Sequence, residues 1–152
     1  MQTNTRTNAV SDWAALGSRL LLASLFLWSG YSKLAYLGPN IGYMKAYGLP
    51  APELLIWPAL ALELVAGAML LLGWKTRWAA LALVLFTIPA TFIFHAYWGA
   101  PADQALNQQI HFVKNLAIVG GLLAVIANGA GRFAIERVEK VLPLGAAAQS
   151  AR

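Results

Sequence analysis

Four long apolar runs, separated by short polar segments, account for most of the chain. They cover residues 13–34, 52–73, 76–98 and 108–127. Each is close to the roughly 20 residues that a helix needs to cross about 30 Å of hydrocarbon. None has the broad polar face of a surface helix, which excludes a soluble bundle. The pattern therefore predicts an all-α membrane protein, a bundle of four spanning helices.

Shorter elements are expected outside these runs. Residues 36–52, rich in Gly, Pro and Tyr, predict a short interfacial element rather than a further span. An Ala-Pro-Ala-Asp turn at 100–103 predicts a helix start. Residues 132–142 have apolar positions at helical spacing with basic residues between them, which predicts a short amphipathic helix on the cytoplasmic surface. The expected divisions are a cytoplasmic tail at 1–12, a four-helix transmembrane domain at 13–128 and a cytoplasmic tail at 129–152.

The composition agrees with a membrane protein and limits its chemistry. Hydrophobic residues make up 59% of the chain and charged residues only 11%, well below the share in soluble domains. Because there is no cysteine, disulfides, thiolate catalysis and cysteine-ligated iron–sulfur or zinc sites are excluded. Any redox chemistry would need a borrowed cofactor.

Basic residues gather at one end of the predicted spans. Seven lie on the side that holds both termini and the turn at 73–77, and two lie on the other side. The positive-inside rule then predicts that both termini are cytoplasmic. The isoelectric point of about 9.8 fits anionic lipid headgroups as partners and needs no nucleic acid. The seven are Arg6, Lys75, Arg77, Arg132, Arg137, Lys140 and Arg152, and the two are Lys33 and Lys45.

Each predicted span carries one narrow polar stripe. Glu63 lies about 15 Å deep at about 1.5 Å per residue, and Gly67 on the same face lets another helix approach closely. A charge near a helix centre costs about 2.5–3.5 kcal/mol, which favours clustering of opposite charges. We expect Glu63 to pair with Arg19, Lys114 or both. Further stripe residues are Lys33, Thr87, Thr91, His95, Gln108, His111, Asn115 and Ile118.

This cluster has two interpretations. It can be a buried polar network that only fixes the register of the helices. Alternatively, two cations that face one carboxylate leave a spare positive charge, which suits an anion or the carbonyl oxygens of a quinone. In the second interpretation the ligand-binding residues are Arg19, Lys114 and Asn115, and the proton-handling, catalytic residues are Glu63, His95 and His111. Two histidines at helix ends are a weak signal for a metal or haem, and no metal is assigned.

Three segments carry a specific combination of motifs. They read GLPAPELLIWPALALELVAGAMLLLGWKTR, QQIHFVKNLAIVGGLL and GAGRFAIE. The motifs are Glu-x-x-x-Gly at Glu63, Gly-x-x-x-Arg at Gly73, and Phe-x-Lys-Asn-Leu at 112–116. From about residue 19 to 136 the chain closely resembles the DoxX family of small bacterial inner-membrane proteins. One departure is Ala134 and Glu136, where the family often has Ser and then Asp.

The resemblance implies a four-helix inner-membrane subunit linked to quinone-dependent oxidation. Some members of the family are the small subunit of a thiosulfate:quinone oxidoreductase, and others partner redox enzymes. The matched polar positions are Glu63, Arg77, Lys114 and Asn115, with Arg19 and Lys33 in the first helix. The residues assigned to structure or packing are Lys33, Gly67, Gly73, Arg77 and Gly121.

We therefore expect the membrane subunit of a quinone-linked redox system, which binds a quinone head or a small anionic substrate at the buried Arg/Glu/Lys cluster. A quinone is the candidate cofactor, and a redox protein and further copies of the chain are candidate partners. The alternatives are a non-catalytic anchor or assembly protein and a small oligomeric permease. A quinone site predicts a lateral opening with apolar walls, a permease an aqueous path, and an anchor a sealed core.

Overall fold

The computed structural model describes residues 3–136 of the 152-residue chain. Over this range the fold is helical, with no strand, which confirms the all-α class. The elements are α1 (Thr3–Ala35), α2 (Leu37–Ala46), α3 (Pro52–Leu72), α4 (Thr76–Phe94), the short 3-10 helix η1 (Tyr97–Gly99) and α5 (Ala102–Asn128).

Four helices are long and apolar enough to cross a membrane, in segments 9–35, 52–72, 76–99 and 102–128. They confirm the four predicted spans. The fourth begins earlier than predicted because the helix starts directly after Pro101. At ten residues, α2 is too short to span a bilayer, which confirms a short element between the first two spans.

The predicted terminal segments are only partly described. Helix α1 begins at Thr3, so most of the expected N-terminal tail continues the first spanning helix. Of the expected C-terminal tail, residues 129–136 are described. The amphipathic helix predicted over 132–142 extends beyond the described residues.

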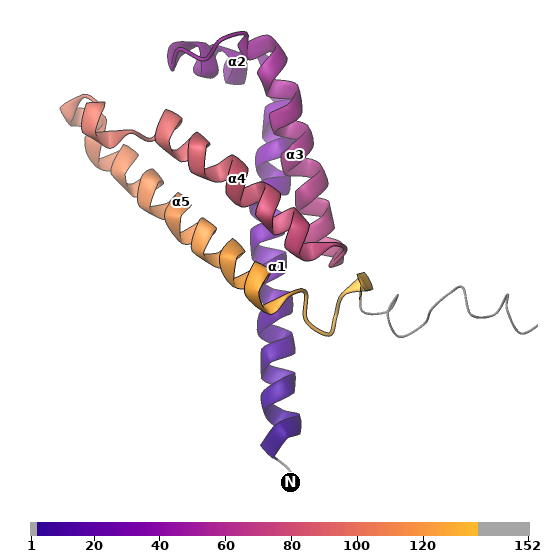
Figure 1. Cartoon of the computed structure of the whole chain (residues 1–152). Helices are drawn as coiled ribbons and strands as arrows, with labels where there is room; N and C mark the ends of the chain where they lie inside the picture. The colour runs from indigo at the N-terminus through magenta and orange to yellow at the C-terminus, as the bar shows by residue number, and fades with distance from the viewer. Residues whose placement is uncertain (1–2, 137–152) are drawn as a thin grey trace, which may run out of the picture.

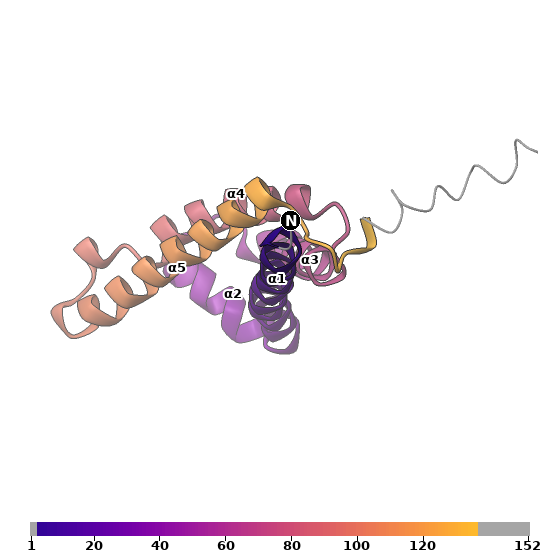
Figure 2. The same cartoon turned by 90° about the horizontal axis from the view of Figure 1, so that it is seen from below.

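The spanning helices form two arms that meet at one end. Helix α1 packs along α3, and α4 packs along α5 (Figure 1). The turn at 73–75 connects the arms at what we call the joined end, and they diverge toward α2, at the open end (Figure 1). Figure 2, which looks along α1, shows α4 and α5 running away from the α1/α3 arm.

The main hydrophobic core fills the joined end. Small side chains on α4, Ala79 and Ala80, let the arms approach there. A second, smaller core of Met44, Ile56 and Leu60 seats α2 on α3 at the open end. The main core consists of Ala23, Phe26, Ala66, Leu70, Ala79, Ala80, Leu83, Val84, Val119, Leu122 and Val125.

Large apolar side chains cover the outer surface of the spanning helices. Leu21 is 75% exposed, Leu54 71% and Leu85 64%. These surfaces contact lipid in the membrane, because water would make such exposure costly. Trp13 and Trp78 are exposed at the joined end, where an interfacial aromatic belt is expected. Which side of the membrane this end faces stays a prediction.

Two glycines let α1 and α3 approach closely. A Cβ on Gly67 would lie 3.1 Å from Cγ of Leu27, and one on Gly30 would lie 2.7 Å from Cγ of Leu64. The absence of a side chain at Gly67 therefore makes room for Leu27 of α1. At Gly121 a Cβ would meet Leu22 only at 3.5 Å, an ordinary contact, so this glycine is not a tight notch.

The close approach at Gly30 gives a testable difference between two glycines of α1. Alanine is favoured over glycine in a helix by about 0.5–1 kcal/mol, but at Gly30 the new Cβ overlaps Leu64, and overpacking costs about 1–3 kcal/mol. Gly30→Ala should therefore lower the melting temperature of the purified protein. A Cβ on Gly17 would have no neighbour within 4 Å, so Gly17→Ala should raise it. Shifts of equal sign in the two variants would contradict this packing.

Candidate functional site

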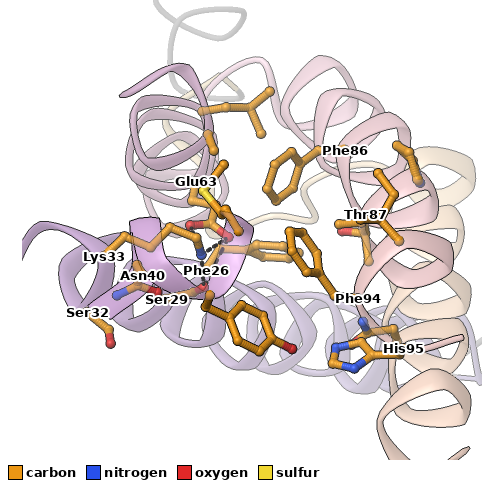
Figure 3. A pocket seen from close by; sticks show the side chains of 18 of the residues that line it. Phe26, Ser29, Ser32, Lys33, Asn40, Glu63, Phe86, Thr87, Phe94 and His95 are labelled. Carbon is orange, nitrogen blue, oxygen red and sulfur yellow. Dashed lines mark hydrogen bonds and ion pairs between the residues drawn. The ribbon is translucent and has the colours of Figure 1, made fainter. Parts of the chain in front are cut away.

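Glu63 forms an ion pair with Lys33 of α1. Nζ of Lys33 lies 2.8 Å from Oε2 and 2.9 Å from Oε1 of Glu63. The same ammonium donates to Oγ of Ser29 at 2.8 Å, and Ser29 donates to Oε1 of Glu63 at 3.0 Å. Figure 3 shows these three side chains together. They form what we call the α1/α3 triad.

This pairing corrects a prediction. The expectation that Arg19, Lys114 or both balance Glu63 is wrong, because Lys33 takes that position. Side chains on a helix point back toward its N-terminus, so the long Lys33 side chain runs one turn down α1, past Ser29 and into the bundle. Lys33, assigned beforehand only to structure, is thus the counter-ion.

Arg19 is fully buried at the joined end, away from Glu63. Its Nη1 donates to the carbonyl of Leu70 at 3.3 Å, and Nη2 donates to the carbonyl of Phe133. Gly73 makes room for it: its φ is +70°, and a Cβ there would overlap Nη1 of Arg19. Arg19 therefore binds backbone carbonyls near the end of α3 and in the segment that follows α5.

Residues 129–136 fold back over the joined end, and we call this segment the strap. Two of its side chains, Ala130 and Ala134, are buried. The Glu136 carboxylate accepts a hydrogen bond from the backbone N–H of Thr76 at 3.2 Å, at the N-terminus of α4, where negative charge is stabilising. Glu136 thus supplies a carboxylate that caps α4.

Two further contacts hold the ends together. Asp12 accepts a hydrogen bond from the backbone N–H of Arg132 at 2.9 Å. Arg77, a predicted structural residue, donates through Nη2 to the carbonyl of Ala127 at 3.3 Å. Arg77 therefore connects α4 to the end of α5.

A cavity of about 730 Å³ lies between the two arms, toward the open end. Most of its walls are apolar side chains, and Trp28, Leu55 and Ile93 are both lining residues and exposed on the outer surface. The cavity therefore opens sideways, between the arms. Of the predicted site residues, Lys33, Glu63, His95, Lys114 and Asn115 line it, whereas Arg19 and His111 do not. Figure 3 shows Lys33 and Glu63 on one side and Thr87, Phe94 and His95 on the other.

Helix α2 covers the open end of the cavity. Tyr43 stacks on Phe94 of α4 with the ring centroids 5.4 Å apart, and Tyr47 meets the same ring edge-on, also at 5.4 Å. Burial raises the pKa of the Tyr43 hydroxyl above its ordinary value, and a hydrogen bond with Tyr47 raises it further. Tyr43 therefore keeps its proton and is a neutral side chain beside the cavity.

The polar stripes of α4 and α5 form one connected network. Nδ1 of His95 lies 2.8 Å from Oε1 of Gln108, and Nε2 of Gln108 donates to the Tyr47 hydroxyl at 3.1 Å. The rings of His95 and His111 stack with centroids 5.1 Å apart, and Nδ1 of His111 lies 2.9 Å from Nζ of Lys114. The structure thus brings together both histidines and Lys114 on the α4/α5 arm. Within residues 3–136 no group of three or more His, Cys, Asp or Glu side chains is placed to hold a metal ion.

Thr87 is a lining residue that the sequence marked only as part of a stripe. It is 6% exposed, and within the described chain its hydroxyl oxygen has no hydrogen-bond partner. The Thr91 hydroxyl donates to the backbone carbonyl of Thr87 at 2.6 Å and so does not pair with the Thr87 hydroxyl. In the sequence, Thr87 lies four residues before Thr91 and eight before His95. This helical spacing was the available sign that the three side chains share one face.

Comparisons with known proteins agree with these features. A family model described as DoxX matches residues 14–96, and a model of the SURF4 family matches residues 56–142. Inner membrane protein YqjF of Escherichia coli is 31% identical over 129 residues, which cover 85% of this chain and 94% of that protein. Inner membrane protein YphA of the same organism is 28% identical over 120 residues, 79% and 86% of the two chains.

A more distant likeness involves a eukaryotic protein. The Surfeit locus protein 4 homolog of Schizosaccharomyces pombe is 33% identical over 82 residues, which cover 53% of this chain and 27% of that protein. No solved structure matches the chain significantly.

Proposed function

The chain belongs to the DoxX family and is a multi-pass inner-membrane protein, and on that premise we propose that it is the membrane subunit of a quinone-linked redox system. The quinone head would bind in the cavity between the two arms. The proposal moves the ligand site away from Arg19, which lies at the joined end, and keeps Lys114 and Asn115 as ligand-binding residues.

The observation that carries the proposal is the sideways-opening cavity with apolar walls. Its volume of about 730 Å³ is within the usual range of about 300–1,000 Å³ for small-molecule sites. A quinone dissolves in the bilayer through its apolar tail, and a lateral opening lets it enter without crossing water. An anchor protein would need only a sealed core, so this opening favours the binding function.

Charge within the cavity supports the same class of ligand. Lys33 and Glu63 neutralise each other. Lys114 also lines the cavity, and among the described residues its ammonium contacts an imidazole rather than a carboxylate. Lys114 therefore brings to the cavity wall a cation that no described carboxylate neutralises, which favours carbonyl oxygens or a small anion near the α4/α5 arm.

Replacing Lys114 tests this function. We expect Lys114→Met to reach the membrane at normal levels, because Lys114 is an exposed residue. It should bind decylubiquinone about tenfold more weakly, because a charge-assisted hydrogen bond is lost. The measurement is quinone retention by the purified protein in lipid nanodiscs, with empty nanodiscs subtracted.

The matched control is Lys45→Met, an exposed lysine of α2 outside the cavity. It should retain wild-type binding. Unchanged quinone binding in Lys114→Met would contradict the proposed site. A wild-type protein that retains sulfate but no quinone would assign the cavity to a small anion instead.

A further inference from the structure

We propose that His95 makes the cavity select the reduced quinol, with its hydroxyl groups, over the oxidised quinone. The selection comes from a hydrogen-bond acceptor, Nε2 of His95, whose tautomer is fixed by Gln108. This inference rests on the proposed function, because it concerns a ligand in the same cavity. In this inference, side chains of the α4/α5 arm recognise the quinone or quinol head group.

The α1/α3 triad has no donor left for a ligand. The Lys33 ammonium has three protons, and its three contacts are with Ser29 and both oxygens of Glu63. The Ser29 hydroxyl donates its hydrogen bond to Glu63 as well. On the opposite wall, His95, Lys114 and Asn115 line the cavity, and we assign the hydrogen bonds of the ligand to these side chains.

The tautomer of His95 follows from its neighbours. The structure places the amide oxygen Oε1 of Gln108 2.8 Å from Nδ1 of His95, while Nε2 of Gln108 donates to the Tyr47 hydroxyl. A carbonyl oxygen only accepts, so Nδ1 must carry the proton. In a neutral ring Nε2 then presents a lone pair. Within residues 3–136 no hydrogen bond occupies this nitrogen.

His111 has the opposite tautomer. The Lys114 ammonium can only donate, so Nδ1 of His111 accepts, and the ring proton is on Nε2. The two rings stack 23° from parallel with their centroids 5.1 Å apart.

Thr87 lies on the same wall. Its hydroxyl oxygen is buried and has no hydrogen-bond partner among the described residues, so it is not open to the cavity and adds no donor for a ligand. Figure 3 shows Thr87 and His95 on the same side of the cavity.

A quinol and a quinone differ at the atom that His95 contacts. A quinol hydroxyl donates to Nε2 and accepts from Lys114 through the same oxygen. A quinone carbonyl would place its lone pair against that of Nε2, which forfeits one hydrogen bond and leaves the acceptor unpaired. The quinone retains only its contact with Lys114, so it binds more weakly.

The test compares decylubiquinol and decylubiquinone on the full-length protein in nanodiscs under argon. We expect wild-type protein to bind the quinol about tenfold more tightly than the quinone. His95→Phe keeps a ring that can stack on His111 but has no acceptor, and it should bind both forms equally. Equal affinities in the wild type would overturn the selection by His95 and leave the proposed function intact. Absence of binding for both forms would overturn both proposals.

Gln108 is a positioning residue in this scheme, and it has a matched control. Gln108→Leu should reduce the preference for quinol, whereas Gln109→Leu, at an exposed neighbouring position, should keep it. The 15N imidazole spectrum gives a readout that is independent of binding. The wild type should show His95 protonated at Nδ1 and His111 at Nε2, and Gln108→Leu should change only the His95 signals. A His95 ring protonated at Nε2 in the wild type would overturn the inference.

Discussion

Replacing Glu63 with alanine should remove most of the assembled protein from the membrane. The change leaves the Lys33 ammonium in a low-dielectric site with only Ser29 as a partner. Removal of one partner of a buried ion pair costs about 3–5 kcal/mol. We expect the lower end of that range, because the Lys33 side chain is 22% exposed and can turn toward the cavity. Even so, the loss is a large share of the about 5–15 kcal/mol that stabilises a typical protein.

Two variants distinguish the lost pair from a general effect of substitution. The double variant Lys33→Met/Glu63→Gln has similar volume and no charge, and it should recover the membrane level and melting temperature, since a neutral replacement of both partners is often tolerated. Glu53→Ala, at an exposed position in the first turn of α3, should behave as the wild type. The measurements are the amount of protein in the membrane fraction and its melting temperature in detergent. A double variant as impaired as Glu63→Ala would contradict the ion-pair explanation.

The spanning helices could be predicted from the sequence because length and hydropathy decide whether a segment crosses a bilayer. Beyond the first turn of α3, Glu63 is the one charged residue of its apolar run, and the ends of that run are marked by Pro52 and Gly73. The backbone of such a segment must satisfy its own hydrogen bonds in lipid, which leaves the helix as the solution. The boundaries therefore agree to within a few residues, apart from α1 and the start of α5.

That Glu63 needs a cationic partner also followed from the sequence, but the identity of the partner did not. Counting residues gives the depth of each Cα and ignores the length of the side chain. Lys33 starts nearer the open end than Glu63, and its side chain covers the difference by pointing back along α1. Arg19 and Lys114 were favoured because only backbone depth was compared.

The cavity could not be predicted because it depends on how the two arms diverge. The pattern of apolar and polar residues shows which face of a single helix is buried. It contains no information on the angle between α3 and α4. That angle is set by packing at the joined end, where Ala79 and Ala80 admit close contact, and by α2, which is seated at the other end. Consequently, the sequence identified His95, Lys114 and Asn115 as polar positions, but not that they share a wall with Thr87.

The strap could not be predicted from the sequence either, although its two glycines indicated a change of chain direction. Gly129 and Gly131 have φ of +79° and +74°, a conformation that favours glycine, and they turn the chain back after α5. In the sequence, glycines directly after an apolar run are a signal for the end of a helix and carry no information on where the chain goes next. The role of Arg19 as the residue that binds the strap requires contacts between positions more than a hundred residues apart.

Replacing Arg19 with leucine should release the strap from the joined end. The guanidinium bridges the carbonyls of Leu70 and Phe133, and hydrogen bonds to a charged group contribute about 1.5–3 kcal/mol each. Leucine fills part of the volume but donates nothing, so both contacts are lost. We expect a lower melting temperature and faster amide hydrogen exchange in the peptide that covers residues 129–136, including the Glu136 amide bonded to the Gly73 carbonyl.

The strap itself offers the matched control for this change. Arg132 is exposed, and its structural contact with Asp12 is made through its backbone N–H rather than its guanidinium, so Arg132→Leu should leave exchange in 129–136 unchanged. Gly73→Ala should reproduce the Arg19→Leu effect, because its Cβ would occupy the space of the guanidinium and require a left-handed φ of +70° from alanine. Because Arg19 lies outside the cavity, protein that remains folded should bind quinone normally. Unaltered exchange over 129–136 in Arg19→Leu would show that the buried contacts of the strap, chiefly Ala130 and Ala134, hold it without the guanidinium.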